Sequence, residues 1–369
     1  MSATPHSPSD PSALARRDVL LDRLIEASTS TMALFSVHIG DRLAFYDVLA
    51  SEGALTPGQL AVRTGTHERY VREWLEHQAV VGIVAVEPGT SGDGRRFYLP
   101  AGHDEVLADR ESLNYLAPLA QITVGAARPI DDVVQAFRTG GGVPFGDYGR
   151  DMREGQARMN RAAFLYQLGG EWIPAIPDVD RRLGEDPPAR IGDLGCGAGW
   201  SAIGLARTYG KVVVDGFDLD APSIEMASRN AVQYGVQDRV RFAVRDAGAA
   251  DLEGQYDLVT AFECVHDMAN PVAALRVMRA LTKTGGTVLV VDERAGEAFE
   301  PMSSGVEGLL YGFSVLHCLP SGMADSPSAG TGTLMRPDTF RRYAAEAGFT
   351  SVETLPIDHL MFRFYRLTP

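Results

Sequence analysis

A glycine-rich turn between an apolar run and a helix-forming run constrains this fold more than any other feature. The stretch RIGDLGCGAGWSAIGLA covers residues 190–206 and has glycines at 195, 197 and 199. Glycine adopts positive φ without strain, so such a turn lets the backbone approach a bound nucleotide closely. Beyond Pro187-Pro188, short apolar runs alternate with helix-forming runs as far as TVLVVDE at 287–293. This alternation predicts βαβ units and a mostly parallel sheet with helices on both faces.

Acidic residues close the strands that this alternation predicts. Asp193 lies at the end of the first strand in RIGDL, Asp218 ends the second in GFDLD, and Asp246 follows the third in RFAVRD. In an open α/β sheet the ligand lies at the carboxyl ends of the strands, so we expect these three carboxyl groups around one ligand. The oxygens of Asp218 can accept both hydroxyls of a ribose, and Asp246 can accept the exocyclic amine of adenine.

These carboxyl groups argue against a dinucleotide, although residues 197–202 fit the dinucleotide pattern GxGxxA. A dinucleotide places its pyrophosphate at the N-terminus of the helix, close to Asp193. Like charges a few ångströms apart in a partly dry site cost on the order of several kcal/mol. The acids favour a nucleoside that lacks phosphates and carries a positive charge, a description that S-adenosylmethionine fits.

The motifs DLGCGAG, GFDLD, RDA and YDLVTAFE occur in this order, and the chain ends in two expected strands, the last of them antiparallel. Over roughly residues 191–367 this set resembles class I S-adenosylmethionine-dependent methyltransferases. The resemblance implies an α/β fold with a Rossmann-like seven-stranded sheet, S-adenosylmethionine as cofactor and S-adenosylhomocysteine as product. The residues that it implies for cofactor binding are Asp193, Gly195, Gly197, Gly199, Asp218, Leu219, Asp246, Ala247, Phe262 and Glu263.

The front half of the chain is organised differently. Residues 1–13 are rich in Ser and Pro and predict a disordered tail, and residues 14–110 predict a helical and winged-helix domain. In that domain Thr56-Pro57 starts one helix, Thr66 caps the next, and two short strands follow around a glycine-rich turn. Residues 111–186 predict a helical linker and lid, and residues 187–369 the sheet domain.

With this front half, the chain is similar to bacterial small-molecule O-methyltransferases that carry a winged-helix domain. The patterns GGGVPFGDYG, LGGEWIPAIPDV and VHDMANP carry that similarity. The long first helix is apolar on more than one face, so we expect it to pack against a second subunit. The resemblance implies the same arrangement, a homodimer formed through the N-terminal domain.

The segment ECVHDMANP follows the fourth expected strand and holds the main catalytic candidates. A neutral imidazole accepts a proton from a hydroxyl near pH 7, so His266 is a candidate general base. In the O-methyltransferases that the chain resembles, this position often reads His-Asp-Trp. Here His266 and Asp267 match, and Met268 replaces the tryptophan. The alternative is that His266 only holds the loop. Glu171 is a candidate base if carbon is methylated, with a helix-surface role as its alternative.

Candidate acceptor-binding residues follow the glycine-rich loop RTGGGVPFGDYG or lie in the apolar segment around residue 311. They are Tyr148, Gln156, Asn160, Tyr311 and His317. Those near the loop fit a lid over the site. A solvated helix face is their alternative, and for His317 the alternative is a buried structural histidine. No metal site is expected, because no group of His, Cys and Asp residues has ligand spacing in the sequence.

Composition limits the classes of binding partner and of function that are possible. The net charge of −14 disfavours nucleic acid, no apolar run is long enough to span a membrane, and three distant cysteines suit a reduced cytoplasm. We expect a cytoplasmic, homodimeric S-adenosylmethionine-dependent methyltransferase of secondary metabolism, acting at oxygen on a small apolar or aromatic metabolite. The alternatives are transfer to carbon or nitrogen, a cyclase or decarboxylase that binds the same cofactor, and a winged-helix transcriptional regulator.

Overall fold

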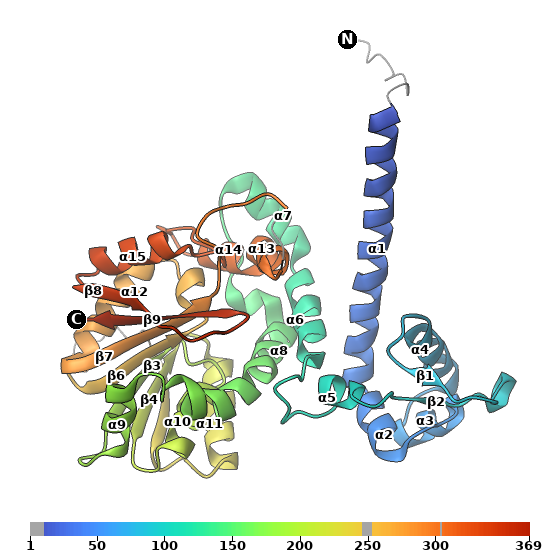
Figure 1. Ribbon diagram of the computed structural model, residues 1–369, viewed down its shortest axis with the longest axis horizontal. Coiled ribbons are helices and arrows are strands. Elements are labelled where there is room, and N and C mark those ends of the chain that lie inside the picture. The colour runs from blue at the N-terminus through green and yellow to red at the C-terminus, as the bar shows by residue number, and fades with distance from the viewer. Residues whose placement is uncertain (1–10, 246–252, 303–304) are drawn as a thin grey trace. The chain divides into compact units, whose positions relative to one another are not determined.

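The computed structural model describes residues 11–245, 253–302 and 305–369, so Asp246 and Ala247 lie outside the described residues. The chain divides into two compact units, Met1–Val124 and Gly125–Pro369 (Figure 1). The sequence placed boundaries after residues 110 and 186 instead. None of the described helices combines the length and the apolar character that crossing a lipid bilayer requires.

Helices dominate the first unit, and a seven-stranded sheet dominates the second. The first unit contains α1 (Pro11–Arg42), α2 (Phe45–Glu52), α3 (Pro57–Thr64), α4 (Glu68–Val80), β1 (Ala85–Val86), η1 (Gly92–Gly94), β2 (Phe97–Tyr98), α5 (His103–Leu107) and most of α6 (Ala117–Ala127). The second unit begins with α7 (Ile130–Thr139), η2 (Phe145–Tyr148), α8 (Gly149–Ala162), the π-helix η3 (Ala163–Trp172) and α9 (Pro177–Gly184). It continues with β3 (Arg190–Leu194), α10 (Trp200–Thr208), β4 (Val213–Asp218), α11 (Ala221–Gln233), β5 (Val240–Val244), β6 (Tyr256–Phe262), η5 (Val265–Asp267), α12 (Pro271–Leu281) and β7 (Thr282–Glu293). It ends with α13 (Glu307–Phe313), the π-helix η6 (Ser314–Cys318), α14 (Leu319–Gly322), α15 (Pro337–Glu346), β8 (Ser351–Thr354) and β9 (Phe362–Thr368).

Local capping sets the helix starts in the first unit. The Thr56 hydroxyl accepts the N–H of Gln59, the Gln59 side chain accepts the N–H of Thr56, and Pro57 occupies the first turn of α3. This reciprocal pair satisfies two N–H groups that a helix start leaves without partners. The expected cap of α4 was wrong by one residue, because a ring nitrogen of His67 accepts the first-turn N–H of Arg69.

Most of α1 is exposed within its own unit. The helix begins at Pro11, so residues 11–13, which the sequence placed in the tail, are helical. Six large apolar side chains between residues 19 and 32 are each more than half exposed. They are Val19 at 68%, Leu20 at 56%, Leu21 at 52%, Leu24 at 57%, Ile25 at 65% and Met32 at 59%. A soluble chain rarely leaves such a continuous apolar surface uncovered.

The sheet of the second unit has the order β5-β4-β3-β6-β7-β9-β8 (Figure 1). Strands β3 to β7 run parallel to one another, whereas β9 runs antiparallel between β7 and β8. This confirms the seven-stranded sheet that the sequence predicts. The connections turn back between β3 and β6, so the carboxyl ends of these two strands flank the point where open α/β sheets bind ligands.

Alternating side chains of β7 show how both faces of the sheet are covered. Leu289 and Val291 contribute to one core with α9, η3 and α10, whereas Val288 and Val290 contribute to another with α12 and α15. Side chains of a strand alternate between its two faces, so a run of four buried apolar residues fits a strand with helices on both sides.

The π-helix η3 belongs to the core of the second unit although it lies in the expected linker and lid. Phe164, Leu168 and Trp172 are buried in the core that covers one face of the sheet. Its backbone approaches α10 so closely that a Cβ on Gly204 would lie 2.0 Å from the Phe164 carbonyl oxygen. This part of the chain therefore helps to fix α10, and with it the turn that precedes α10.

Candidate functional site

The glycine turn after β3 is held by the buried carboxyl group of Asp193. Its Oδ2 accepts the Ser201 hydroxyl of α10 at 2.5 Å, and its Oδ1 accepts the Thr260 hydroxyl of β6 at 2.7 Å. Burial raises the pKa of Asp193 to about 6, against these two hydrogen bonds. Asp193 thus joins β3, β6 and α10 around the turn, and its charge reaches a ligand from behind the turn.

The three glycines of the turn all have positive φ, of 65°, 50° and 78° at 195, 197 and 199. A Cβ on Gly195 would lie 2.7 Å from the Cys264 sulfur, and one on Gly199 would lie 2.4 Å from the Phe242 ring. A Cβ on Gly197 would meet no protein atom within 4 Å. Two glycines therefore allow close packing inside the protein, and the middle one faces open space.

Asp218 at the end of β4 is tied to the same turn. Its Oδ2 accepts the N–H of Gly197 at 2.8 Å, and its Oδ1 accepts the N–H of Asp220 at 2.9 Å. Burial raises the pKa of Asp218. The N–H of Leu219 also donates to this carboxylate, so three of its four lone-pair positions have protein donors and one is left for a ligand hydroxyl. Leu219, which follows Asp218, is 72% exposed at the rim.

An arginine that the sequence analysis did not assign as a ligand supports this corner. Arg153 of α8 forms a two-pronged ion pair with Asp220, at 2.6 and 2.8 Å, and both side chains are largely buried. Asp220 also caps α11 by accepting the N–H of Ser223. No local sequence signal joins residues 67 positions apart, so only the fold reveals this pair.

The backbone is strained where β6 ends, at the residue that follows Phe262. Phe262 is buried against Phe164, and Glu263 has a φ of 53°, which a side chain with a Cβ rarely adopts. Burial and the charge of Asp292 raise the pKa of Glu263 to about 8, while a hydrogen bond with Asn160 of α8 opposes the shift. Asn160 and Glu263, both expected at the site, are therefore in contact.

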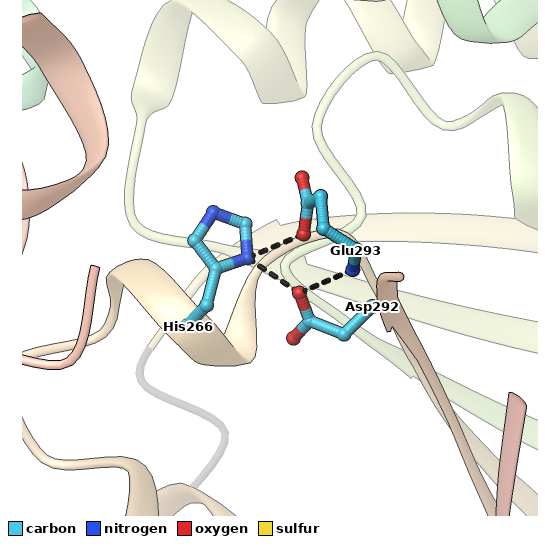
Figure 2. A group of neighbouring side chains, drawn as sticks. All are labelled: His266, Asp292 and Glu293. Atoms are coloured by element: carbon cyan, nitrogen blue, oxygen red, sulfur yellow. Dashed lines mark hydrogen bonds and ion pairs between the residues drawn. The ribbon is translucent and has the colours of Figure 1, made fainter. Parts of the chain in front are cut away.

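His266 lies on η5 with its ring held by two carboxyl groups of β7 (Figure 2). Nδ1 is 2.5 Å from Oδ1 of Asp292 and 2.8 Å from Oε2 of Glu293, and the side chains are 2%, 2% and 12% exposed. The same Asp292 oxygen accepts the backbone N–H of Glu293 at 3.0 Å. Nε2 points away from both carboxyl groups, and the Cys318 side chain forms a hydrogen bond with the His266 ring.

The two carboxyl groups beside His266 are not equivalent. Burial raises the pKa of both acids, but at Asp292 the charge of His266 and the hydrogen bonds from His266 and Glu293 together outweigh it and lower the pKa. At Glu293 burial dominates and raises the pKa well above its usual range. Of the two acids, Asp292 therefore ionises more readily, and Glu293 keeps its proton more readily. Although burial opposes it, the carboxyl groups raise the pKa of His266 well above 6.5.

The same three groups meet a simple distance criterion for metal ligands, since their ligand atoms lie within 4.8 Å of one another. Two atoms bound to one ion at about 2.0–2.2 Å lie about 3 Å or more apart. The separation of 2.5 Å between Nδ1 and the Asp292 oxygen is shorter and suits a shared hydrogen. Sequence spacing could not reveal this cluster, because residues 266 and 292 meet only through the pairing of β6 and β7.

Two further catalytic candidates differ in position. Asp267 is the last residue of η5, and burial raises its pKa to about 6. Glu171 is exposed on η3, where its carboxylate accepts Gln167 at 3.4 Å, and its charge acts on His359. The exposure of Glu171 fits the helix-surface alternative.

The candidate acceptor residues do not form one group. Tyr148 is fully buried, and its hydroxyl donates to the Leu316 carbonyl, so it is used inside the protein. His317 is buried beside it on η6. Gln156 is half-buried on α8, and Tyr311 is 37% exposed on α13 with its hydroxyl accepting Arg336.

Asp292 and Glu293 are the functional candidates that the sequence analysis missed. They end the stretch TVLVVDE, so they carry the signal that identified Asp218, an acid at the carboxyl end of an apolar strand. Applied to β7, the same pattern of an acid at the carboxyl end of an apolar strand identifies both residues.

Two family models match the chain. A model described as a methyltransferase domain matches residues 167–354, half of the chain. A model described as an Rv2258c-like winged HTH domain matches residues 28–109. The first covers the strands of the sheet from β3 to β8 and leaves out β9, and the second covers the winged-helix arrangement of the first unit.

Curated relatives match part of the chain. A ubiquinone biosynthesis O-methyltransferase of Azoarcus sp. (strain BH72) is 26% identical over 163 residues, which are 44% of this chain and 65% of that enzyme. The enzyme of the same description from Bordetella pertussis is 33% identical over 99 residues, 27% of this chain and 40% of that enzyme. The chain thus matches less than two thirds of the length of either relative.

Solved structures match nearly the whole chain. The mitomycin 7-O-methyltransferase MmcR has a TM-score of 0.70 at 19% identity, covering 96% of this chain and 99% of that one. Human N-acetylserotonin methyltransferase, solved in complex with SAM, has a TM-score of 0.70 at 17% identity, covering 98% and 99%. At these identities the likeness establishes a shared fold.

The two carboxyl groups beside His266 are expected to respond differently to neutralisation. Asp292→Asn removes the negative charge that holds the ring proton, so the pKa of His266 should fall. Glu293→Gln replaces a carboxyl group whose own pKa is raised by burial, so the pKa of His266 should change less. An NMR titration of the His266 ring in both variants measures this. An equal or larger fall in Glu293→Gln would contradict the assignment of the charge to Asp292.

Proposed function

Because the chain belongs to the methyltransferase-domain family, we propose that it transfers a methyl group from S-adenosylmethionine to an oxygen of a small metabolite. The family models agree with the resemblance to class I methyltransferases with a winged-helix N-terminal domain. The observation that carries the proposed reaction is the His266–Asp292 hydrogen bond at the edge of the sheet that also carries the glycine turn.

The acids at the strand ends fit S-adenosylmethionine. Asp218 keeps acceptor capacity for a ribose hydroxyl, and the open space at Gly197 admits a ligand beside the turn. Asp193, Asp218, Glu263 and Asp267 are acids whose pKa is raised largely by burial. A positively charged ligand lowers the cost of ionising them, and a phosphate raises it.

The cofactor supplies an activated methyl group, so the protein has to align the acceptor and remove its proton. We assign the proton transfer to Nε2 of His266. The hydrogen bond from Nδ1 to Asp292 fixes the orientation of the ring and stabilises the imidazolium that forms. The acceptor proton then resides on Nε2 while Asp292 remains ionised. Since His266 has to start unprotonated, the rate should rise with pH through its raised pKa.

The first prediction of this proposal concerns Asp218. Asp218→Ala removes the acceptors for the ribose hydroxyls and should raise the Kd for S-adenosylhomocysteine about tenfold or more, since hydrogen bonds to charged groups contribute about 1.5–3 kcal/mol. Calorimetry measures the affinity. Asp215→Ala is the matched control, because Asp215 lies on the same strand and accepts Arg190 and Tyr256 instead. Unchanged affinity in Asp218→Ala would refute the ribose contact.

The second prediction concerns His266. His266→Ala should lower kcat about 10²–10⁴-fold, the usual contribution of a general base, and leave the affinity for S-adenosylhomocysteine nearly unchanged. The assay follows labelled methyl from the cofactor into a panel of phenols and hydroxylated heterocycles. Glu171→Ala is the control and should keep full activity, because Glu171 lies on the helix surface. Full activity of His266→Ala would show that His266 is not the base. If the wild type transferred labelled methyl to none of the acceptors, the proposed methyl transfer would be refuted.

We propose further that the chain forms a homodimer through its N-terminal unit and works in the cytoplasm. The exposed apolar side chains of α1 support a helical partner, and the three cysteines are free thiols. A DNA-binding role for the winged helix is less favoured. Arg69 and Arg72 of α4 are paired with Glu73 and Asp93 at 2.5 and 2.8 Å, so this helix offers little net positive charge to phosphates.

The dimer is tested by placing a charge in the apolar surface of α1. Leu24→Glu should convert a dimer into a monomer, because it places a carboxylate among side chains that association buries. Light scattering after size exclusion measures the mass. Glu26→Lys is the control, since two helical positions turn its side chain to the opposite side of α1. A monomeric wild-type chain, or a dimeric Leu24→Glu variant, would contradict the proposal.

A further inference from the structure

His317 has a polar atom that the protein itself leaves unused. The side chain is 1% exposed on the π-helix η6, and its Nε2 finds no hydrogen-bond partner among the described residues. A buried polar group without a partner costs about 1–3 kcal/mol, and π-helical turns occur frequently at functional sites. A phenylalanine would fill the same space without that cost, so a structural role alone does not account for the imidazole.

Two aromatic contacts hold the ring in one position. The ring packs edge to face against the rings of Tyr148 and Phe145. The ring centroids are 4.5 and 5.8 Å apart, and the interplanar angles are 73° and 71°. The Tyr148 hydroxyl donates to the Leu316 carbonyl at 2.9 Å, and the N–H of Val143 donates to the Pro320 carbonyl at 2.9 Å. The glycine-rich loop is thereby fastened to the segment that carries His317, and a fixed ring gives its free nitrogen a fixed direction.

Cys318 links this ring to His266. Its sulfur lies 3.5 Å from Nδ1 of His317 and also takes part in a hydrogen bond with His266. Burial raises the pKa of the Cys318 thiol, so the thiol keeps its hydrogen and can donate it to Nδ1 of His317. Burial and the charge of His266 lower the pKa of His317 to about 3, which keeps its ring neutral. With Nδ1 as acceptor, the single ring hydrogen lies on Nε2, which is then a donor.

We propose that Nε2 of His317 donates a hydrogen bond to a second oxygen of the acceptor, beside the oxygen that His266 deprotonates. This inference rests on the proposed function and adds a substrate class to it: a ring or similar apolar body that carries two oxygen functions. The second oxygen is a hydroxyl, ether or carbonyl that accepts a hydrogen bond. His317 is thus a specificity-determining residue that takes no proton from the acceptor, and Phe145 and Tyr148 position it.

The test compares ligands with one and two oxygens on the same ring. Phenol, catechol, resorcinol and hydroquinone are titrated by calorimetry into the full chain saturated with S-adenosylhomocysteine. In the wild type, at least one dihydroxybenzene should bind about 2- to 13-fold tighter than phenol, the gain of one neutral hydrogen bond. His317→Phe keeps the aromatic packing and should lose that gain while its affinity for phenol stays the same.

Two further variants separate the donor from packing. His317→Gln keeps an N–H donor and should retain part of the preference, and His359→Phe, a histidine stacked on Phe362 elsewhere in the second unit, should retain all of it. The inference would be overturned if His317→Phe kept the wild-type preference for a dihydroxybenzene over phenol. It would also be overturned if the wild type showed no such preference, or bound none of the four ligands. A His317-dependent preference without transfer of labelled methyl would leave this inference standing and refute the proposed reaction instead.

Discussion

The buried carboxyl group of Asp193 is the contact on which the arrangement of the site depends. Through Thr260 and Ser201 it joins the ends of β3 and β6 to the start of α10. The turn between β3 and α10 is thereby fixed on both sides, so the N–H of Gly197 meets Asp218, and Gly195 packs against Cys264. Cys264 lies two residues before His266, so one buried acid sets the positions of the ribose candidate and the base candidate together.

Carboxyl groups outnumber cations around the carboxyl ends of these strands. The structure accommodates these acids in two ways. Asp220 is paired with Arg153, and although burial opposes it, this pairing lowers the pKa of Asp220. At Glu263 and Glu293 burial outweighs the charge of His266 and raises the pKa of both. At Asp292 the charge of His266 helps to lower the pKa against burial. The chemistry of the site therefore depends on which acid is left ionised, more than on how many acids are present.

The sequence predicts the sheet well because the signal for each strand lies within one short stretch of residues. Apolar runs closed by acids identify β3 and β4 together with Asp218, and the final strand is correctly expected to be antiparallel. The sequence predicts contacts between distant elements poorly. The Arg153–Asp220 pair and the Asp292 partner of His266 join residues 67 and 26 positions apart. For Glu171 the sequence left two roles open, and its side chain is exposed on η3.

The order of strands has a consequence for how the surroundings of His266 are assembled. Residues 362–368 form β9, which pairs with β7 through Asp292↔Arg363 and Glu293↔Phe362. As long as β9 is unpaired, this edge of β7 is open, and the two acids that hold His266 lie on it. The antiparallel strand therefore closes the sheet beside the histidine, so an undocked β9 would leave Asp292 and Glu293 on an unpaired strand.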